Sequence, residues 1–319
     1  MLLLTTPLCV SSANLVSPDM PLQRAFDESV ATSSTSTLFL APGVHRLQQP
    51  LQLKATHSKL RVVGLPGSSI SGGAIITGWK QHPFEKTILQ ASVATILDGV
   101  SSWPRNMWIG GRRAERSALA GALWTPWTLK GGYEPTDDGY HVHSLTPLLW
   151  RHASSVEMVY TAQGSQWSES RCTVAAVEPL AWPRNASVLV RMKQPCWFNV
   201  RHKPCGQGTS RVASIENAGI LKQLQRGEWY LDFLAKTVYY APLAGERASD
   251  LEAVLPITNG LIHAAAGVSS LSFVNVTFEH DMWAQPNGGE QFARCRLLVP
   301  DQSLGSACSY LLPSCVLHF

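Results

Sequence analysis

Short apolar segments separated by glycine and proline turns fill residues 37–73, and no stretch between them is long enough for a helix. The segments are, in order, 38–40, 44–47, 51–53, 60–64 and 69–73. The first two are joined by the turn Ala41-Pro42-Gly43. A doubly wound parallel sheet needs a crossover helix between its strands. The pattern therefore excludes that fold and favours a β-sandwich, a barrel or a solenoid.

The same pattern returns near the end of the chain. Leu261-Ile262-His263 leads into an apolar run over 268–273 and another over 274–278. The repeat is irregular and about two dozen residues long, which lies within the range of solenoid coils. The return favours the solenoid and predicts that apolar side chains of 38–70 and 261–278 share one interior.

Residues 80–250 interrupt these two stretches and also have strand character. Leu148-Leu149-Trp150, Val156–Tyr160 and Ser187–Met192 are apolar or alternate, as strands do. Gly227–Asp232 followed by Thr237–Tyr240 predicts a hairpin with its turn at 233–236. Solenoids accept such insertions at the turns between coils.

Residues 18–31 are the best helical segment. Leu22, Ala25, Phe26 and Val30 fall on one face at helical spacing, and Ser17 or Asp19 can cap the start. The chain begins MLLLTTPLCVSSA, which has the apolar run of a signal peptide but no positive segment before it. A cleaved signal is therefore one of two interpretations of this start.

Charge and composition exclude several kinds of function. The formal net charge is +4 with no long basic run, so nucleic-acid binding is not expected. No stretch of eighteen apolar residues is present, so no transmembrane segment is expected. No C-x-x-C pair with matching partners occurs, so zinc is not expected, and we expect neither a metal nor a cofactor. The 11 tryptophans either stack on sugar rings or fill β cores.

The cysteines number seven, so at least one is free or pairs with another chain. Cys172 and Cys196 lie at either end of a predicted strand pair. A disulfide between them is expected if the protein is exported.

Several short motifs together resemble the large right-handed parallel β-helix glycoside hydrolases and their relatives, over residues 36–283. The motifs are Ala41-Pro42-Gly43-Val44-His45, Ile70–Gly73 with Gly78-Trp79, Trp167–Cys172, Ile215–Ala218, Gly227–Asp232 and Val276–His280 with Trp283. The resemblance implies a pectin-lyase-like fold, secretion or cell-surface exposure, and hydrolysis of a polysaccharide or glycan.

This resemblance gives the expected fold class, an all-β right-handed parallel β-helix with few coils, a large inserted β-rich domain and a short N-terminal helix. The expected divisions are a signal or capping helix over 1–35, first coils over 36–80, an inserted domain over 81–250, resumed coils over 251–283 and a divergent, disordered tail over 284–319.

The family's catalytic carboxylates are expected on coils beyond Phe278-Glu279-His280, where this sequence departs from the pattern. The catalytic residues are therefore unknown, and we expect an N-terminal fragment that is inactive alone.

The best candidates for sugar contact are Glu279, His280 and Asp281, with Trp283 as a stacking platform. In a strand, the side chains of residues i and i+2 project from the same side, so Glu279 and Asp281 could both project from one side of this strand. The alternative is a coil end with solvated acids and a packed tryptophan. Trp124, with Trp127 and Tyr133, could line a glycan groove or form a core patch.

Three further motifs have a functional and a structural interpretation. His141 and His143, after Asp137-Asp138, could form half of a metal site or be surface histidines. Gly110–Arg116 could meet an acidic sugar or form a solvated hairpin. Glu228 and Asp232 belong to the predicted hairpin and are interpreted as structural.

Three functions fit these observations: the N-terminal part of a glycoside hydrolase, a non-catalytic carbohydrate-binding or cell-surface module, and a truncated product without activity. Polysaccharide or glycan is the expected partner, at an extracellular or cell-surface location. The sugar, its linkage and the oligomeric state do not follow from the sequence.

Overall fold

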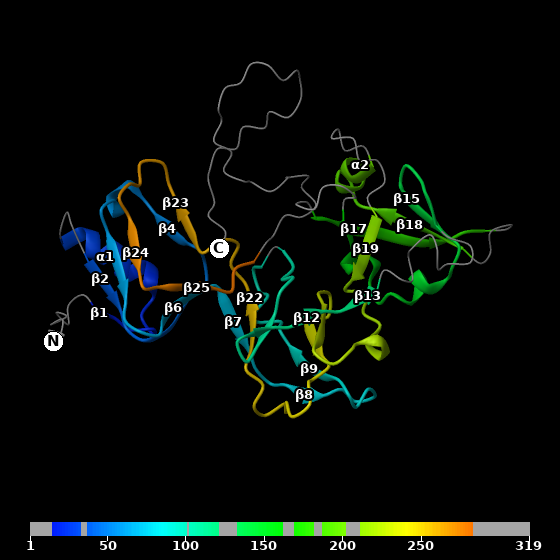
Figure 1. Cartoon of the computed structure of the whole chain (residues 1–319), viewed down its shortest axis with the longest axis horizontal. Coiled ribbons are helices and arrows are strands. Elements are labelled where there is room, and N and C mark those ends of the chain that lie inside the picture. The colour runs from blue at the N-terminus through cyan, green and yellow to red at the C-terminus, as the bar shows by residue number, and fades with distance from the viewer. Residues whose placement is uncertain are drawn as a thin grey trace, which may run out of the picture. The chain divides into compact units, whose positions relative to one another are not determined.

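The structure is a computed structural model that describes residues 15–32, 37–100, 102–120, 133–161, 169–181, 187–201 and 211–282. It is mainly β and contains several sheets (Figure 1). The chain divides into two compact units. Among the described residues, the first comprises those up to Ala74 and 255–282, and the second comprises Ile75–Val254. In the described part of the chain, no helix has the length and apolarity needed to cross a membrane.

The first unit consists of one helix and short strands. The helix is α1 (Leu22–Thr32), and a 3-10 turn, η2, spans Ala55–His57. The strands are β1 (Leu15–Val16), β2 (Thr37–Leu40), β3 (Gly43–Arg46), β4 (Leu51–Leu53), β5 (Arg61–Gly64), β6 (Ser68–Ser71), β23 (Ile262–Ala264), β24 (Ser272–Val274) and β25 (Thr277–Glu279).

These strands form parallel sheets in which successive passes of the chain lie side by side (Figure 1). The orders are β1-β2-β5-β24, β3-β6-β25 and β4-β23. Thr37 pairs with Arg61, so one pass takes 61 − 37 = 24 residues. Arg61 in turn pairs with Ser272, far along the sequence. The predicted partnership between the two strand-rich stretches is therefore confirmed.

One apolar core lies inside these sheets. Leu51, Leu53, Val62 and Ile70 are at most 1% exposed, and α1 contributes the fully buried Phe26. The later strands pack against the same core through side chains that are only partly buried: Leu261, Ile262, Val268, Leu271, Phe273, Val276 and Phe278. The shared interior expected from the sequence is present, and its last layer is the most exposed.

The helix begins later than the sequence pattern predicts. Its first residue is Leu22, because Pro21 disfavours the helical conformation at the residue before it and itself suits the start of a helix. The carbonyl of Pro21 accepts the N–H of Ala25 at 3.3 Å. Leu22, Ala25 and Phe26 are buried as predicted, whereas Val30 is half-buried.

The chain leaves and rejoins the first unit at one point. The carbonyl of Gly72 accepts the backbone N–H groups of Ile257 at 2.9 Å and Thr258 at 3.3 Å. A Cβ at position 72 would collide with the hydroxyl of Thr258, so glycine permits this close approach. These hydrogen bonds join the segment that leaves the first unit to the segment that returns to it, and they close the coil.

The second unit contains many antiparallel strand pairs, together with the parallel pair β12–β20. A seven-stranded sheet has the order β13-β19-β16-β17-β18-β15-β14, and a five-stranded sheet has the order β12-β20-β21-β9-β8. A third sheet, β11-β10-β22-β7, includes the two strands at the unit boundaries.

The strands of this unit are β8 (Lys80–Gln81), β9 (Leu89–Ser92), β10 (Trp108–Ile109), β11 (Arg112–Arg113), β12 (Glu115–Arg116), β13 (Ala118–Ala120), β14 (Tyr133–Pro135), β15 (Gly139–Val142), β16 (Glu157–Thr161), β17 (Glu169–Pro179), β18 (Val188–Met192), β19 (Arg211–Glu216), β20 (Glu228–Asp232) and β21 (Thr237–Tyr240), with β7 (Gly73–Ile76) and β22 (Ala253–Pro256) at the boundaries. The helical segments are α2 (Cys196–Arg201), η4 (Thr146–Leu149), η5 (Ala153–Ser155) and η6 (Leu221–Gln223).

Two sequence predictions in this unit have opposite outcomes. The hairpin is confirmed, since β20 and β21 pair antiparallel with residues 233–236 between them. The strand predicted at Leu148-Leu149-Trp150 is wrong, because Thr146–Leu149 forms a 3-10 helix with Pro147 in its first turn. Leu148 and Leu149 are exposed and only Trp150 is buried, so apolar composition alone misled the prediction.

Candidate functional site

The outward face of the β3-β6-β25 sheet carries a polar row across its three strands. Ile70 of β6 points into the core, so its neighbours Ser69 and Ser71 project from the opposite face of the sheet, where they are only 7% and 0% exposed. Arg46 pairs with Ser71, and Ser71 pairs with Glu279. Adjacent strands lie about 4.8 Å apart, so the Arg46 and Glu279 backbones are separated by about 10 Å. A cation, a hydroxyl and a carboxylate thus follow one another across the sheet.

Glu279 is the most accessible acid of this row. Its side chain is 31% exposed. Ser69, on the neighbouring strand, donates its hydroxyl to Glu279 Oε1 at 2.8 Å. The carboxylate is therefore oriented by the sheet and still reaches solvent.

His280 is the most constrained member of the site. Its φ of 61° lies in the left-handed region, which ends β25 and turns the chain. Ser71 Oγ accepts the N–H of Gly73 at 3.2 Å and lies 2.8 Å from His280 Nδ1. The serine proton is then available for Nδ1, and this arrangement suits a neutral ring protonated on Nε2.

The electrostatic surroundings of His280 favour the same neutral form. Burial lowers the pKa of His280 below its usual value, and the positive charge of Arg46 lowers it further. The carboxylate of Glu279, 3.8 Å from Nδ1, acts in the opposite direction without reversing the shift.

Asp281 has a different geometry from the one that strand alternation predicts. Because β25 ends at Glu279 and His280 turns the chain, the alternation does not extend to Asp281. Its Oδ1 accepts the backbone N–H groups of Gly260 and Met282, each at 2.8 Å. This carboxylate stabilises a turn.

The sequence did not single out Arg46, Ser69 or Ser71. They become part of the site only through the strand pairing that places them beside Glu279. Ser69 and Ser71 are buried, so Arg46 and Glu279 are the members of the row that can offer a donor and an acceptor to a sugar hydroxyl. Within the described ranges, no three His, Cys, Asp or Glu side chains gather as a metal site would require.

The predicted aromatic contacts fall mostly outside the described residues. Trp283, Trp124 and Trp127 belong to ranges that the structure does not describe. Tyr133 begins β14 and packs edge-on against Tyr140, with ring centroids 5.1 Å apart. The glycan groove expected at Trp124 remains a prediction.

The histidines of the possible metal motif lie on the seven-stranded sheet. His141 is on β15, and His143 Nε2 lies 3.7 Å from Glu134 Oε1. Asp138 forms an ion pair of 2.6 Å with Arg191. These contacts account for His143 and Asp138 as surface ion-pair partners.

The first part of the 110–116 segment lies in a hairpin, the kind of structure that the sequence offered as one interpretation, and Glu115–Arg116 forms the separate strand β12. β10 and β11 pair antiparallel across Gly110 and Gly111, whose φ values are 53° and 74°. Glycine takes such angles without strain. Arg112 and Arg113 are exposed, whereas Arg116 is buried.

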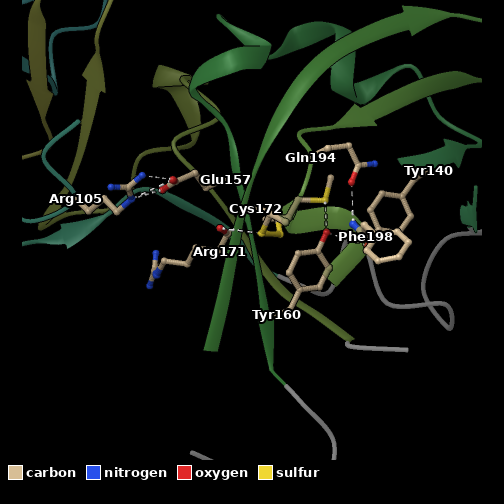
Figure 2. Close-up of a disulfide and its surroundings, with 10 residues drawn as sticks. Arg105, Tyr140, Glu157, Tyr160, Arg171, Cys172, Gln194 and Phe198 are labelled. Carbon is tan, nitrogen blue, oxygen red and sulfur yellow. Dashed lines mark hydrogen bonds and ion pairs between the residues drawn. A yellow bond between two sulfur atoms is a disulfide. The ribbon is translucent and has the colours of Figure 1, made fainter. Parts of the chain in front are cut away.

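Arg116 belongs to a buried ion network that the sequence did not predict. Glu157 is fully buried and accepts hydrogen bonds from Arg105, at 2.6–3.0 Å, and from Arg116. Glu216 accepts from Arg116 at 3.2 Å and from Arg171 (labelled with Glu157 and Arg105 in Figure 2). Burial alone would raise the pKa of Glu157, but the guanidinium groups of Arg116 and Arg105 outweigh it and lower the pKa to about 2. The network therefore links strands β12, β16, β17 and β19.

The predicted disulfide is confirmed. Cys172 on β17 is bonded to Cys196 at the start of α2, with their Cα atoms 5.5 Å apart (Figure 2). It lies in the main core of the second unit.

The second acid of the hairpin, Asp232, is also fully buried. It lies 2.6 Å from Arg151 Nε and 3.3 Å from His152 Nε2, and it accepts the N–H of Ala235 at 2.8 Å. These contacts fix the hairpin turn, and they agree with the structural interpretation of this residue.

Comparison with known proteins finds likeness in structure only. No family model matches the sequence, and no curated protein matches it. A solved structure titled "Glycoside hydrolase" is similar, with a TM-score of 0.66 and 21% identity over 86% of this chain and 51% of that one. The chain thus spans about half the length of that protein. A second solved structure, "The complex structure of XylC with xylose", has a TM-score of 0.37 and 10% identity, over 80% of this chain and 32% of that one. The first similarity establishes a shared fold.

Proposed function

We propose that this chain belongs to a right-handed parallel β-helix protein that acts on a polysaccharide or glycan, as a relative of glycoside hydrolases. The observation that carries the proposal is the fold likeness to a glycoside hydrolase over 86% of the chain. The parallel sheets, whose strands repeat after 24 residues (61 − 37), support the β-helix. Arg46 and Glu279, the members of the polar row that reach solvent, offer a donor and an acceptor to a sugar.

Within the described residues, we assign glycan contact to Glu279 and His280, with Arg46 beside them. Cleavage of a glycosidic bond needs two carboxyl groups placed about 5–10 Å apart on either side of the bond. Asp281 does not suit the second role, because its Oδ1 is engaged by two backbone N–H groups. We therefore propose that hydrolysis needs further coils and that this chain alone binds without turnover.

A purely carbohydrate-binding or cell-surface module is the second proposal. The contacts of Asp281, and the hydrogen bond from Ser69 to Glu279, favour it, since they are compatible with binding and supply no acid–base pair. An extracellular or cell-surface location is proposed for either function. The Cys172–Cys196 disulfide supports it, because such bonds persist in oxidising compartments.

The test compares the chain with a longer protein from the same gene, if the gene encodes further coils. Both are incubated with a panel of insoluble and soluble polysaccharides, and co-sedimentation and reducing-sugar release are measured. We expect binding by both and sugar release only by the longer form. Glu279→Gln should weaken binding by about three- to tenfold, because it replaces a charge-assisted hydrogen bond with a weaker neutral one. The matched control Glu178→Gln changes an exposed, ion-paired carboxylate on β17 and should leave binding unchanged.

Absence of binding to every polysaccharide by both forms would refute a glycan function. Binding and release by the longer form, with no effect of Glu279→Gln, would retain the function and remove the assignment of the site. Binding without release by a form that contains all coils would favour the second proposal.

A further inference from the structure

The second unit contains a small pocket between β13, β20 and the segment around η6. Its volume is about 10 Å³, which is room for one water-sized group. Ser117, Gln223 and Glu228 supply its polar lining, and Ala218, Gly219 and Leu224 are among the others. A site of this size accepts a single functional group of a larger molecule.

Two acidic residues are neighbours on adjacent strands here, and one of them lines the pocket. Glu115 of β12 and Glu228 of β20 are direct partners in a parallel pair. Paired residues on adjacent strands project from the same face of the sheet. Glu115 is exposed and Glu228 is half-buried, so one acid is at the surface and the other lines the pocket.

The carboxyl of Glu228 is held in place by the backbone. Its Oε2 accepts the N–H of Gln225 at 2.8 Å, and the backbone of Ala118 also hydrogen-bonds to it. Burial raises the pKa of Glu228, and the nearby Glu115 raises it further, while these backbone hydrogen bonds act in the opposite direction. A further negative charge would therefore be unfavourable beside this pair.

Ser117 supplies an independent sign of a ligand. It is 8% exposed, and its hydroxyl oxygen has no hydrogen-bond partner among the described residues although it is buried. It also lines the pocket. A buried hydroxyl without a partner costs free energy, and this cost is removed when a polar group enters the pocket.

We propose that this pocket binds one hydroxyl group of a neutral sugar, with Ser117 and Glu228 as its hydrogen-bond partners and Glu115 as the second acid beside it. The proposal rests on the proposed glycan function and adds a second contact site, in the other unit. A hydroxyl fits because it both donates and accepts, as a carboxylate and a serine hydroxyl together require. Neutral sugars are preferred because the two acids repel an anionic one.

The test is a titration of the ¹⁵N-labelled full chain with D-glucose, D-galactose, D-xylose and D-glucuronate, followed through the amide signals of Ala118, Gly219 and Glu228. At least one neutral sugar should shift these signals and saturate. Glucuronate, which differs from glucose only in the carboxylate at C6, should shift them less at equal concentration. Ser117→Ala should weaken the binding by about three- to tenfold, the loss of about one hydrogen bond.

Two variants separate the alternatives. Glu115→Gln should raise the affinity for glucuronate toward that for glucose, because it removes one negative charge without altering the pocket lining. Glu279→Gln, in the first unit, should leave the pocket signals unchanged.

Three outcomes would overturn the proposal: no saturable shift with any of the three neutral sugars, a preference for glucuronate, or a shift by calcium chloride that competes with the sugar. The last would identify the acid pair as a cation site. If the pocket signals fail to respond while polysaccharide binding persists and depends on Glu279, the proposed function stands and only this second site is refuted.

Discussion

The two units reach a stable interior by different physical routes. The coils of the first unit stack parallel strands whose inward side chains are apolar. In one pass of the chain, Leu51, Val62 and Ile70 are at most 1% exposed. The second unit combines an apolar core with a disulfide and a buried network of arginines and glutamates. A repeated coil gains its stability from many similar layers, whereas the second unit depends on a few specific contacts. Single substitutions should therefore act more strongly in the second unit.

The largest effect is expected from Glu157→Gln. The change leaves the guanidinium group of Arg105 buried without its carboxylate, and it leaves Arg116 with Glu216 alone. Breaking one partner of a buried ion pair costs about 3–5 kcal/mol. Hydrogen exchange read separately from peptides of each unit should show loss of protection in the second unit and none in the coils. Glu178→Gln, whose carboxylate is exposed and paired with Arg191, should cost less than about 0.5 kcal/mol.

Acid should affect the same network. The pKa of Glu157 is lowered from 4.5 to about 2, so its stabilising contribution is complete above pH 4.5 and is lost as the pH falls toward 2. The loss would amount to about 3 kcal/mol. Urea unfolding of the second unit between pH 5 and pH 2 measures it. The Glu157→Gln variant should have a shallower pH dependence, and equal slopes would contradict this assignment.

Removal of the disulfide should have a similar or slightly smaller effect. Cys172 and Cys196 are 24 residues apart, and closing a loop of this length stabilises by about 3 kcal/mol. A Cys172→Ala/Cys196→Ala variant should unfold its second unit at lower urea concentration, and reductant should then have no further effect on that transition. A reductant-sensitive transition in the double variant would assign the effect to other thiols.

The smallest effects should come from the coils. Ile70→Val removes one methylene group from a buried layer and should cost about 1 kcal/mol. Val274→Ala, at an outward position 38% exposed, should change stability by less than about 0.5 kcal/mol. Urea unfolding followed by hydrogen exchange in peptides of the first unit measures both. A Val274→Ala cost equal to that of Ile70→Val would indicate that the last layer is buried by something further.

Local sequence patterns predicted most of the coil strands and the 228–240 hairpin. Both signals, the alternation of apolar and polar residues and the turn residues, involve positions close together in the sequence. The Cys172–Cys196 bond followed from their positions at the ends of a predicted strand pair. By contrast, Leu148-Leu149-Trp150 was taken for a strand, since an apolar triplet does not reveal the 3-10 turn that begins at Thr146.

The site was only partly predictable for a related reason. Glu279 and His280 stand out as polar residues after a strand, but Ser69 and Ser71 lie about two hundred residues away in sequence and join them only through the register of β6 and β25. The left-handed turn at His280, which separates Asp281 from Glu279, has no sequence signal of the kind that glycine gives. The buried ion network is equally non-local, since Arg105, Glu157 and Glu216 come from distant parts of the chain.

The hydrogen bonds from Ile257 and Thr258 to the carbonyl of Gly72 have a consequence for protein engineering. Since the backbone ends at this junction are already tied together, the coil contains a natural splice point. A bridge of a few glycines and serines in place of the second unit would leave the ladder of the first unit intact. The same junction could accept an unrelated module whose two ends are close in space, and the coil stack would then serve as its carrier.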